Sequence, residues 1–116
     1  AAAKENGVLL MEAFAYLHSP FVAAVKQEID NGTIGDVVYI ESAFLTQGNK
    51  ETDIRMQKET YGGSVYDLGC YNTSMILWML GKLPKVVQGV AEYTDKNIDI
   101  NQYFFCKKMS NSIFFY

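Results

Sequence analysis

The stretch YGGSVYDLGCYNTSMILWMLG, residues 61–81, decides the fold class of this chain. Two glycines at 62–63 permit a bend into a helix, and Gly81 is suited to end that helix in the left-handed conformation. Between them, apolar side chains recur at helical spacing on most sides. The sequence therefore predicts a helix over 64–80, capped by Ser64, that is buried against the rest of the domain.

The segments around this helix have the composition of β-strands. Residues 36–46, 85–93, 101–107 and 112–116 are rich in β-branched and aromatic side chains. The polar residues 94–97 favour a hairpin turn between two of them. We therefore predict an α+β domain with an open, mainly antiparallel sheet that carries helices on one face.

The first half of the chain predicts further elements. Residues 1–7 resemble the last turns of a helix, and the apolar run Val8–Met11 is typical of a strand buried on both faces. A Ser-Pro pair at 19–20 provides a cap and a favoured first residue for a helix that ends at Asn31-Gly32. The polar residues 47–60 predict a loop that includes a helical turn.

Composition limits the classes of function. The chain has 116 residues, of which 49% are hydrophobic and 20% charged, and its formal net charge is -3. This is enough for one ordinary domain, and the scattered basic residues provide no field for nucleic acid. No apolar run approaches the about 20 residues that cross a bilayer. We expect a soluble, cytoplasmic protein that binds neither nucleic acid nor membranes.

Cysteine and histidine usage argues against disulfides and metals. Cys70 and Cys106 are too few for a disulfide framework and lack the spacing of metal ligands, so we expect both to be small buried apolar side chains. His18 is the only histidine, which makes a histidine-based metal site unexpected. The sequence predicts no metal.

Asp67 and Tyr71 are the first candidates for chemistry. They lie four residues apart, so on a helix they share a face, and a tyrosine beside an acid can exchange a proton with a substrate hydroxyl. The alternative, favoured on spacing alone, makes Asp67 a helix N-terminal acid and Tyr71 a packing residue. A tyrosine base also needs a nearby cation, since the phenol pKa is ordinarily about 10, and the sequence alone identifies none.

A second candidate region follows the predicted strand Val8–Met11. Ligands gather at strand ends in open α/β sheets, so Glu12, Tyr16 and His18 are candidates to line a pocket and bind substrate. On spacing alone, the favoured alternative is that Tyr16 packs and His18 is a solvated loop side chain. No glycine-rich dinucleotide fingerprint, phosphate loop or Ser-His-Asp arrangement occurs in the sequence.

Three motifs, in order and at familiar spacing, resemble a known family. They are residues 11–20, residues 32–37, and residues 62–71 with Trp78 and Gly81. Together they are similar to the Gfo/Idh/MocA family of glucose–fructose oxidoreductase and inositol dehydrogenase, over about residues 1–93. The resemblance implies that residues 1–18 are the tail of a Rossmann domain, and residues 19–116 part of a C-terminal substrate and dimerisation domain.

The resemblance also implies a chemistry. Family members use NAD or NADP, bound mainly by an N-terminal domain whose glycine fingerprint and Glu-Lys-Pro motif would precede Ala1. Many carry Asp-x-Gly-x-His where this chain has Asp67-Leu68-Gly69-Cys70-Tyr71, a variant similar to glucose–fructose oxidoreductase and dimeric dihydrodiol dehydrogenase. By resemblance, Tyr71 is the proton donor or acceptor, Asp67 orients the substrate or tunes Tyr71, and the lysine of Glu-Lys-Pro supplies the cation.

The resulting hypothesis is a fragment of an oxidoreductase, inactive alone, whose parent transfers hydride between a nicotinamide and a sugar, polyol or dihydrodiol. The parent is expected to be a homo-oligomer through the sheet face. Ala15 and Leu17 stand where relatives often carry an aromatic or Met and an Arg, so the substrate is not specified. The alternative is a stand-alone interaction or dimerisation module that uses the open sheet without catalysis.

Overall fold

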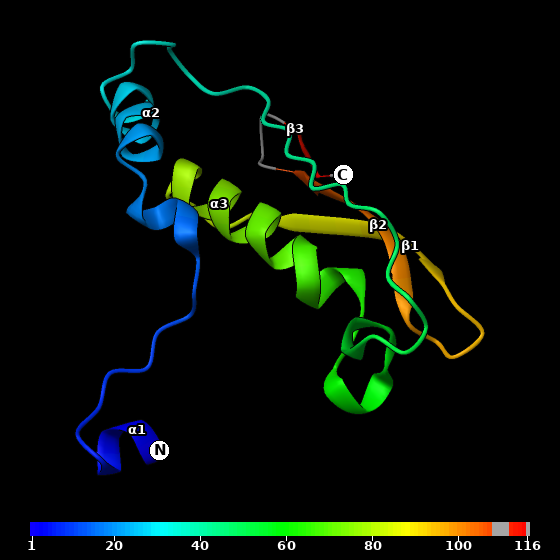
Figure 1. The fold of residues 1–116 in the computed structure, drawn as a ribbon. Helices are drawn as coiled ribbons and strands as arrows, with labels where there is room; N and C mark the ends of the chain where they lie inside the picture. Colours follow the sequence, from blue (N-terminus) through cyan, green and yellow to red (C-terminus); the bar gives the residue numbers. More distant parts are fainter. Residues whose placement is uncertain (108–111, 116) are drawn as a thin grey trace.

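The computed structural model describes the backbone of residues 1–107 and 112–115, and the side chains of residues 1–100. Its strands form one antiparallel sheet in the order β1-β2-β3, with the helices on one side of it (Figure 1). This confirms the predicted α+β class. The elements are α1 (Ala2–Glu5), the 3₁₀ turn η1 (Ala15–His18), α2 (Pro20–Asp30), the 3₁₀ turns η2 (Ile54–Met56) and η3 (Lys58–Thr60), the π-helical turn η4 (Val65–Gly69), α3 (Cys70–Leu80), β1 (Val86–Tyr93), β2 (Asp99–Lys107) and β3 (Ser112–Phe115).

The hairpin of β1 and β2 forms where the sequence predicts it. Its register begins with Val86 opposite Lys107, and the connection between the strands occupies residues 94–98, which include the predicted turn. The backbone N–H of Thr94 donates to the carbonyl of Ile98 at 2.8 Å and closes the turn. Ile98 is only 3% exposed, so the strand that follows the turn begins inside the small core.

The helix that the sequence predicts over 64–80 has two parts in the structure. The π-helical turn η4 leads directly into α3, which ends at Gly81 in the predicted left-handed conformation, with φ 59°. Ile76, Met79 and Asn72 are the buried side chains of α3. Asn72 is polar, and the hydroxyl of Ser42 donates to its amide oxygen at 2.8 Å. The buried face therefore includes one satisfied polar side chain, as burial requires.

Ser64 is the N-cap residue, as predicted, but its side chain accepts no N–H of the helix start, and the capping group comes from the sheet. The Asp99 carboxylate at the start of β2 accepts the backbone N–H of Val65 at 2.7 Å and the hydroxyl of Ser64 at 3.0 Å. Gly63 makes this approach possible. Its φ is 128°, and a Cβ placed there would lie 2.9 Å from the Asp99 carboxyl carbon. The two glycines at 62–63, which the sequence predicts as a bend, therefore also permit close packing.

We expect Asp99→Ala to lower the free energy of unfolding by about 1–2 kcal/mol, because removal of an N-cap leaves orphan N–H groups at the helix start. Asp99→Asn keeps an oxygen acceptor and should lose clearly less. Urea unfolding followed by circular dichroism measures both variants. Equal losses for the two would mean that the cap hydrogen bonds are not what Asp99 contributes.

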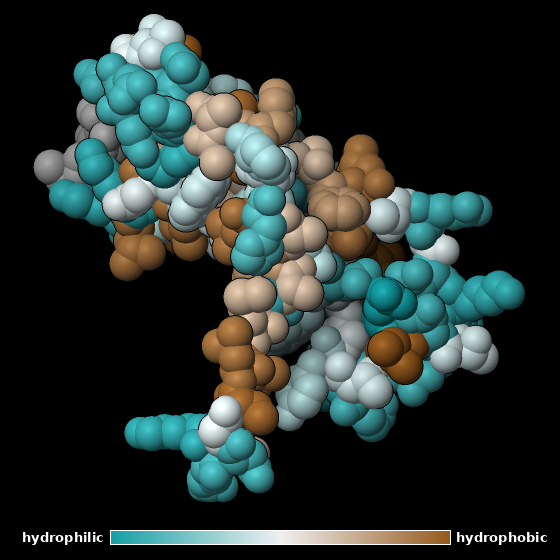
Figure 2. Space-filling view, turned by 60° about the vertical axis from the view of Figure 1, so that its left-hand side comes forward, coloured by the Kyte–Doolittle hydropathy of each residue, from teal (hydrophilic) through white to brown (hydrophobic). Residues whose placement is uncertain are grey.

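Two predicted strands are absent from the described residues. Among the described residues, neither Val8–Met11 nor residues 36–46 are assigned as strands. Leu9 and Leu10 are 90% and 83% exposed, and Figure 2 shows the apolar arm between α1 and the rest of the molecule. A strand buried on both faces requires neighbours on both sides, and this part of the chain offers none. The prediction of a strand at Val8–Met11 is therefore wrong for this structure.

Helix α2 follows its sequence signals. It begins at Pro20, and the Ser19 hydroxyl oxygen accepts the backbone N–H of Val22 at 3.4 Å. The helix ends at Asp30 with Asn31 as its C-cap, after which Gly32 adopts φ 74°. The predicted polar loop over 47–60 contains the turns η2 and η3. No helix in residues 1–107 is long and apolar enough to cross a bilayer.

Candidate active site

Aromatic rings bring the two candidate regions of the sequence together over α3. The ring of Tyr71 lies 5.5 Å from that of Phe14 in a T-shaped arrangement and 5.7 Å from that of Phe44. The ring of Tyr16 lies 5.9 Å from Phe14 and 6.4 Å from Trp78. Such ring pairs are favourable beyond their area burial. Tyr71 is therefore held between rings from two other segments, and the region after Val8–Met11 does lie beside it.

Tyr16 ties the N-terminal segment to α3 through its hydroxyl. This hydroxyl donates to Oγ of Ser74 at 2.9 Å, and the Ser74 hydroxyl in turn donates to the carbonyl of Cys70 at 2.6 Å. His18, at the end of η1, is exposed, and among the described residues none hydrogen-bonds to it. The structure thus shows a packing contact for Tyr16, and it leaves the predicted substrate contacts of Tyr16 and His18 untested.

A double-mutant cycle of Tyr16→Phe and Ser74→Ala should detect this tie. We expect a coupling of about 0.5–1.5 kcal/mol in the free energy of unfolding, the usual net contribution of a hydrogen bond. Chemical denaturation of the four proteins measures it. Additive losses would show that the hydroxyls do not stabilise each other.

Asp67 is engaged by an arginine that the sequence reasoning missed. Nε of Arg55, in η2, donates to Oδ1 of Asp67 at 2.9 Å. Asp67 lies in the π-helical turn η4, whereas Tyr71 lies in α3. The two residues therefore do not share the one regular α-helical face that the spacing predicts. Such π-helical turns are frequent at functional sites. The Asp67 side chain is 26% exposed, which leaves it accessible.

Arg55 is itself held by Asp53. Oδ1 of Asp53 accepts the backbone N–H of Arg55 at 2.9 Å and its Nη1 at 3.2 Å. The pKa of the Arg55 guanidinium is raised, first by the hydrogen bond to Asp67 and then by that to Asp53. The pKa of Asp53 is lowered, chiefly because the Arg55 backbone N–H stabilises its ionised form. Asp53 and Arg55 are therefore both charged near neutral pH.

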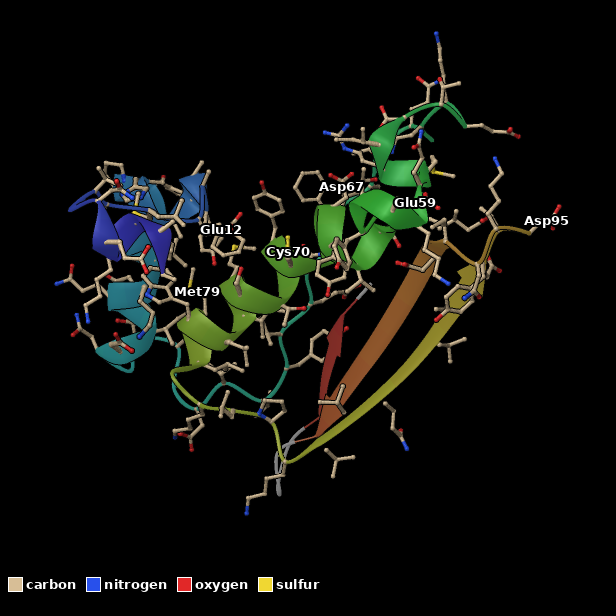
Figure 3. The ribbon with its side chains drawn as sticks, turned by 90° about the horizontal axis from the view of Figure 1, so that it is seen from below. Glu12, Glu59, Asp67, Cys70, Met79 and Asp95 are labelled. Carbon is tan, nitrogen blue, oxygen red and sulfur yellow. The ribbon has the colours of Figure 1, made fainter. Side chains whose placement is uncertain are left out.

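A second carboxylate lies near the start of α3. Figure 3 shows Glu12 beside the turn that carries Cys70. Burial raises the pKa of the Cys70 thiol, and the negative charges of Glu12 and Asp67 raise it further. Cys70 is a half-buried, protonated thiol, and its hydrogen bond goes to the carbonyl of Tyr66. The side chain of Cys106 lies outside the described part of the chain.

Residues 1–100 contain no group of three or more His, Cys, Asp or Glu side chains placed to hold a metal ion. What the described residues assemble is a tyrosine set between aromatic rings, preceded by a carboxylate paired with a guanidinium. This arrangement is suited to bind and exchange a proton with a polar, hydroxyl-bearing molecule.

The chain matches the family model described as the GFO/IDH/MocA C-terminal domain over residues 22–107. This match includes Arg55, Asp67 and Tyr71. The fold is also similar to a crystal structure of a protein from Bordetella bronchiseptica RB50, with a TM-score of 0.69 and 16% sequence identity over 98% of this chain and 31% of that one. At this level of identity, the likeness concerns the fold alone.

Curated relatives are enzymes named for carbohydrate or diol substrates. A dTDP-3,4-didehydro-2,6-dideoxy-alpha-D-glucose 3-reductase of Actinomadura kijaniata is 38% identical over 61% of this chain and 21% of its own length. A D-xylose 1-dehydrogenase (NADP(+)) 2 of Haloferax volcanii is 34% identical over 83% of the chain and 30% of its own length. A trans-1,2-dihydrobenzene-1,2-diol dehydrogenase of Xenopus laevis is 32% identical over 85% and 30%. The chain thus spans less than a third of these relatives.

Proposed function

Because this chain belongs to the GFO/IDH/MocA family, in which it matches the C-terminal domain, we propose that the complete protein is an NAD(P)-dependent oxidoreductase. Its substrate is a sugar, polyol or dihydrodiol, and sugars and dihydrodiols are the classes named for the relatives. The observation that carries the proposal is the placement of Tyr71 between Phe14 and Phe44, one turn after the paired carboxylate of Asp67.

The described residues do not by themselves fit a dinucleotide. A dinucleotide needs a glycine-rich turn between a strand and a helix, and the extended Val8–Met11 is neither paired nor followed by such a turn. We propose that another part of the complete protein holds the nicotinamide, and that residues 1–18 belong to that nucleotide-binding domain. The exposure of Val8–Met11 supports this, since a sheet there would cover it.

The roles of the residues follow from their chemistry. The nicotinamide supplies the acceptor or donor of hydride. Tyr71 moves the proton at the substrate oxygen: it takes the proton when a hydroxyl is oxidised and returns it when a carbonyl is reduced. Asp67 binds a neighbouring hydroxyl and orients the substrate. Tyr16 and His18, on the segment packed beside Tyr71, stay predictions for further substrate contacts.

The test is an activity assay of the complete protein. Keto sugars are offered together with NADH or NADPH, and aldoses and trans-dihydrodiols are offered together with the oxidised cofactors. We expect a change of nicotinamide absorbance with at least one of these substrates. Absence of turnover with every pair, in a folded protein that binds the dinucleotide, would contradict the proposal.

The exposed sheet supports a second part of the proposal, a homo-oligomer. Val86 and Val90 point to the same face of β1, because side chains two positions apart share a face, and they are 49% and 64% exposed. A second copy of the sheet would cover them. Sedimentation of the complete protein should show a dimer or larger assembly, and a monomer at high concentration would contradict this part alone.

A further inference from the structure

We propose that Arg55 is a positioning residue for the oxidoreductase reaction, which holds the Asp67 carboxylate in one orientation beside Tyr71. This inference rests on the proposed function, and it concerns a residue outside the helix that carries Asp67 and Tyr71. The structure supports it by three observations on how Arg55 is held, how it contacts Asp67, and which charges lie near the start of α3.

The backbone of Arg55 is fixed to the start of the helix. The N–H of Gly63 donates to the carbonyl of Arg55 at 2.8 Å. Gly62 lies so close that a Cβ added there would come within 2.6 Å of the Arg55 carbonyl carbon. The N–H of Gly62 also donates to the carbonyl of Gln57 at 2.8 Å, which secures the other end of the turn. The loop residue is therefore anchored to η4, the element that carries Asp67.

The side chain of Arg55 leaves one oxygen of Asp67 available. Nε donates to Oδ1, while Nη1 is occupied by Asp53 on the other side. Among the described residues, Oδ2 of Asp67 accepts no hydrogen bond. Because the donors of a guanidinium point in fixed directions, and Arg55 is held on its other side by Asp53, this contact fixes the position of Oδ1. Arg55 thus presents Oδ2 to a substrate hydroxyl in a defined direction.

Arg55 also offsets the charge of Asp67 near the start of α3. Glu12, from the segment before η1, and Asp67 are both near the turn that begins α3, as their common effect on Cys70 shows. The guanidinium offsets the charge of one of them. It therefore acts on Tyr71 only through Asp67, which makes its role separable by mutation.

The experiment compares Arg55→Gln in two backgrounds of the complete enzyme, wild type and Asp67→Asn. In wild type we expect kcat to fall about tenfold, the size of a coupling between directly bonded groups, with the affinity for the nicotinamide unchanged. In the Asp67→Asn background, we expect no further fall, since the group that Arg55 holds is already altered. Arg55→Lys, which keeps the charge but lacks the planar donors, should show an intermediate loss.

Lys26→Gln provides the matched control, because Lys26 forms another exposed ion pair, with Asp30, away from the site. It should leave kcat unchanged. An equal loss for Arg55→Gln in both backgrounds would overturn the positioning role while leaving the proposed function intact. A wild-type enzyme that turns over no tested substrate would overturn the proposed function, and with it the role of Arg55.

Discussion

Tyr71→Phe in the complete enzyme is expected to lower kcat by about 10²–10⁴-fold, the usual contribution of a general acid or base. The substitution removes only the hydroxyl. The ring stays between Phe14 and Phe44, at centroid distances of 5.5 and 5.7 Å, so the fold and the affinity for the nicotinamide should barely change. Steady-state kinetics and a thermal unfolding curve of the same preparation measure the two effects separately.

Tyr66→Phe is the matched control, because it removes a hydroxyl from the same stretch. Tyr66 is 69% exposed and its ring pairs with Tyr61, at 6.4 Å, away from the aromatic cluster around Tyr71. Its kcat should equal that of the wild type. If Tyr71→Phe also keeps full turnover, Tyr71 does not transfer the proton, and it returns to the packing role that spacing alone favours.

Gly63→Ala is expected to produce the largest loss of stability, roughly 2–4 kcal/mol in the free energy of unfolding. A φ of 128° is strained for any residue with a Cβ, which costs about 1–3 kcal/mol. The new Cβ would also displace the Asp99 carboxylate from the N–H of Val65, and loss of that cap costs about 1 kcal/mol more. Urea unfolding of the protein measures the sum.

Gly48→Ala tests whether this loss is specific to the site of close approach. Nothing lies within 4 Å of a Cβ added at Gly48, and its φ is not in the left-handed range. The substitution should change the free energy of unfolding by less than about 0.5 kcal/mol, as for other surface positions. A comparable loss for both variants would attribute the effect to general glycine flexibility and contradict the steric explanation.

Local signals in the sequence predicted the parts of the fold that local contacts determine. The Ser19 cap and Pro20 begin α2 where expected, Gly81 ends α3, and residues 94–97 form the hairpin turn. Each of these depends on hydrogen bonds within a few residues, which propensity and spacing describe. The predictions of a strand at Val8–Met11 and at residues 36–46 depend on a partner strand, and composition does not supply that partner.

The candidate site, like the fold, was predictable from the sequence only in its local features. The pair Asp67 and Tyr71 follows from helical spacing, but the partners that define their environment come from elsewhere in the chain. Phe14 and Phe44 reach Tyr71 from two distant segments, and Arg55 reaches Asp67 from a loop. One signal for Arg55 was present: it is the only arginine of the sequence, and arginine is the residue best suited to hold a carboxylate.

The long-range cap of the helix has a consequence for the order of folding. Asp99 lies 34 residues beyond the Val65 N–H that it receives. During synthesis at about 5–20 residues per second, the carboxylate emerges from the ribosome a few seconds after the turn that it caps. Until then, the Val65 N–H at the start of this turn lacks its acceptor, and Gly63 lacks the carboxylate that packs against it. The turn around Asp67 therefore closes only after the connection between β1 and β2 has been made.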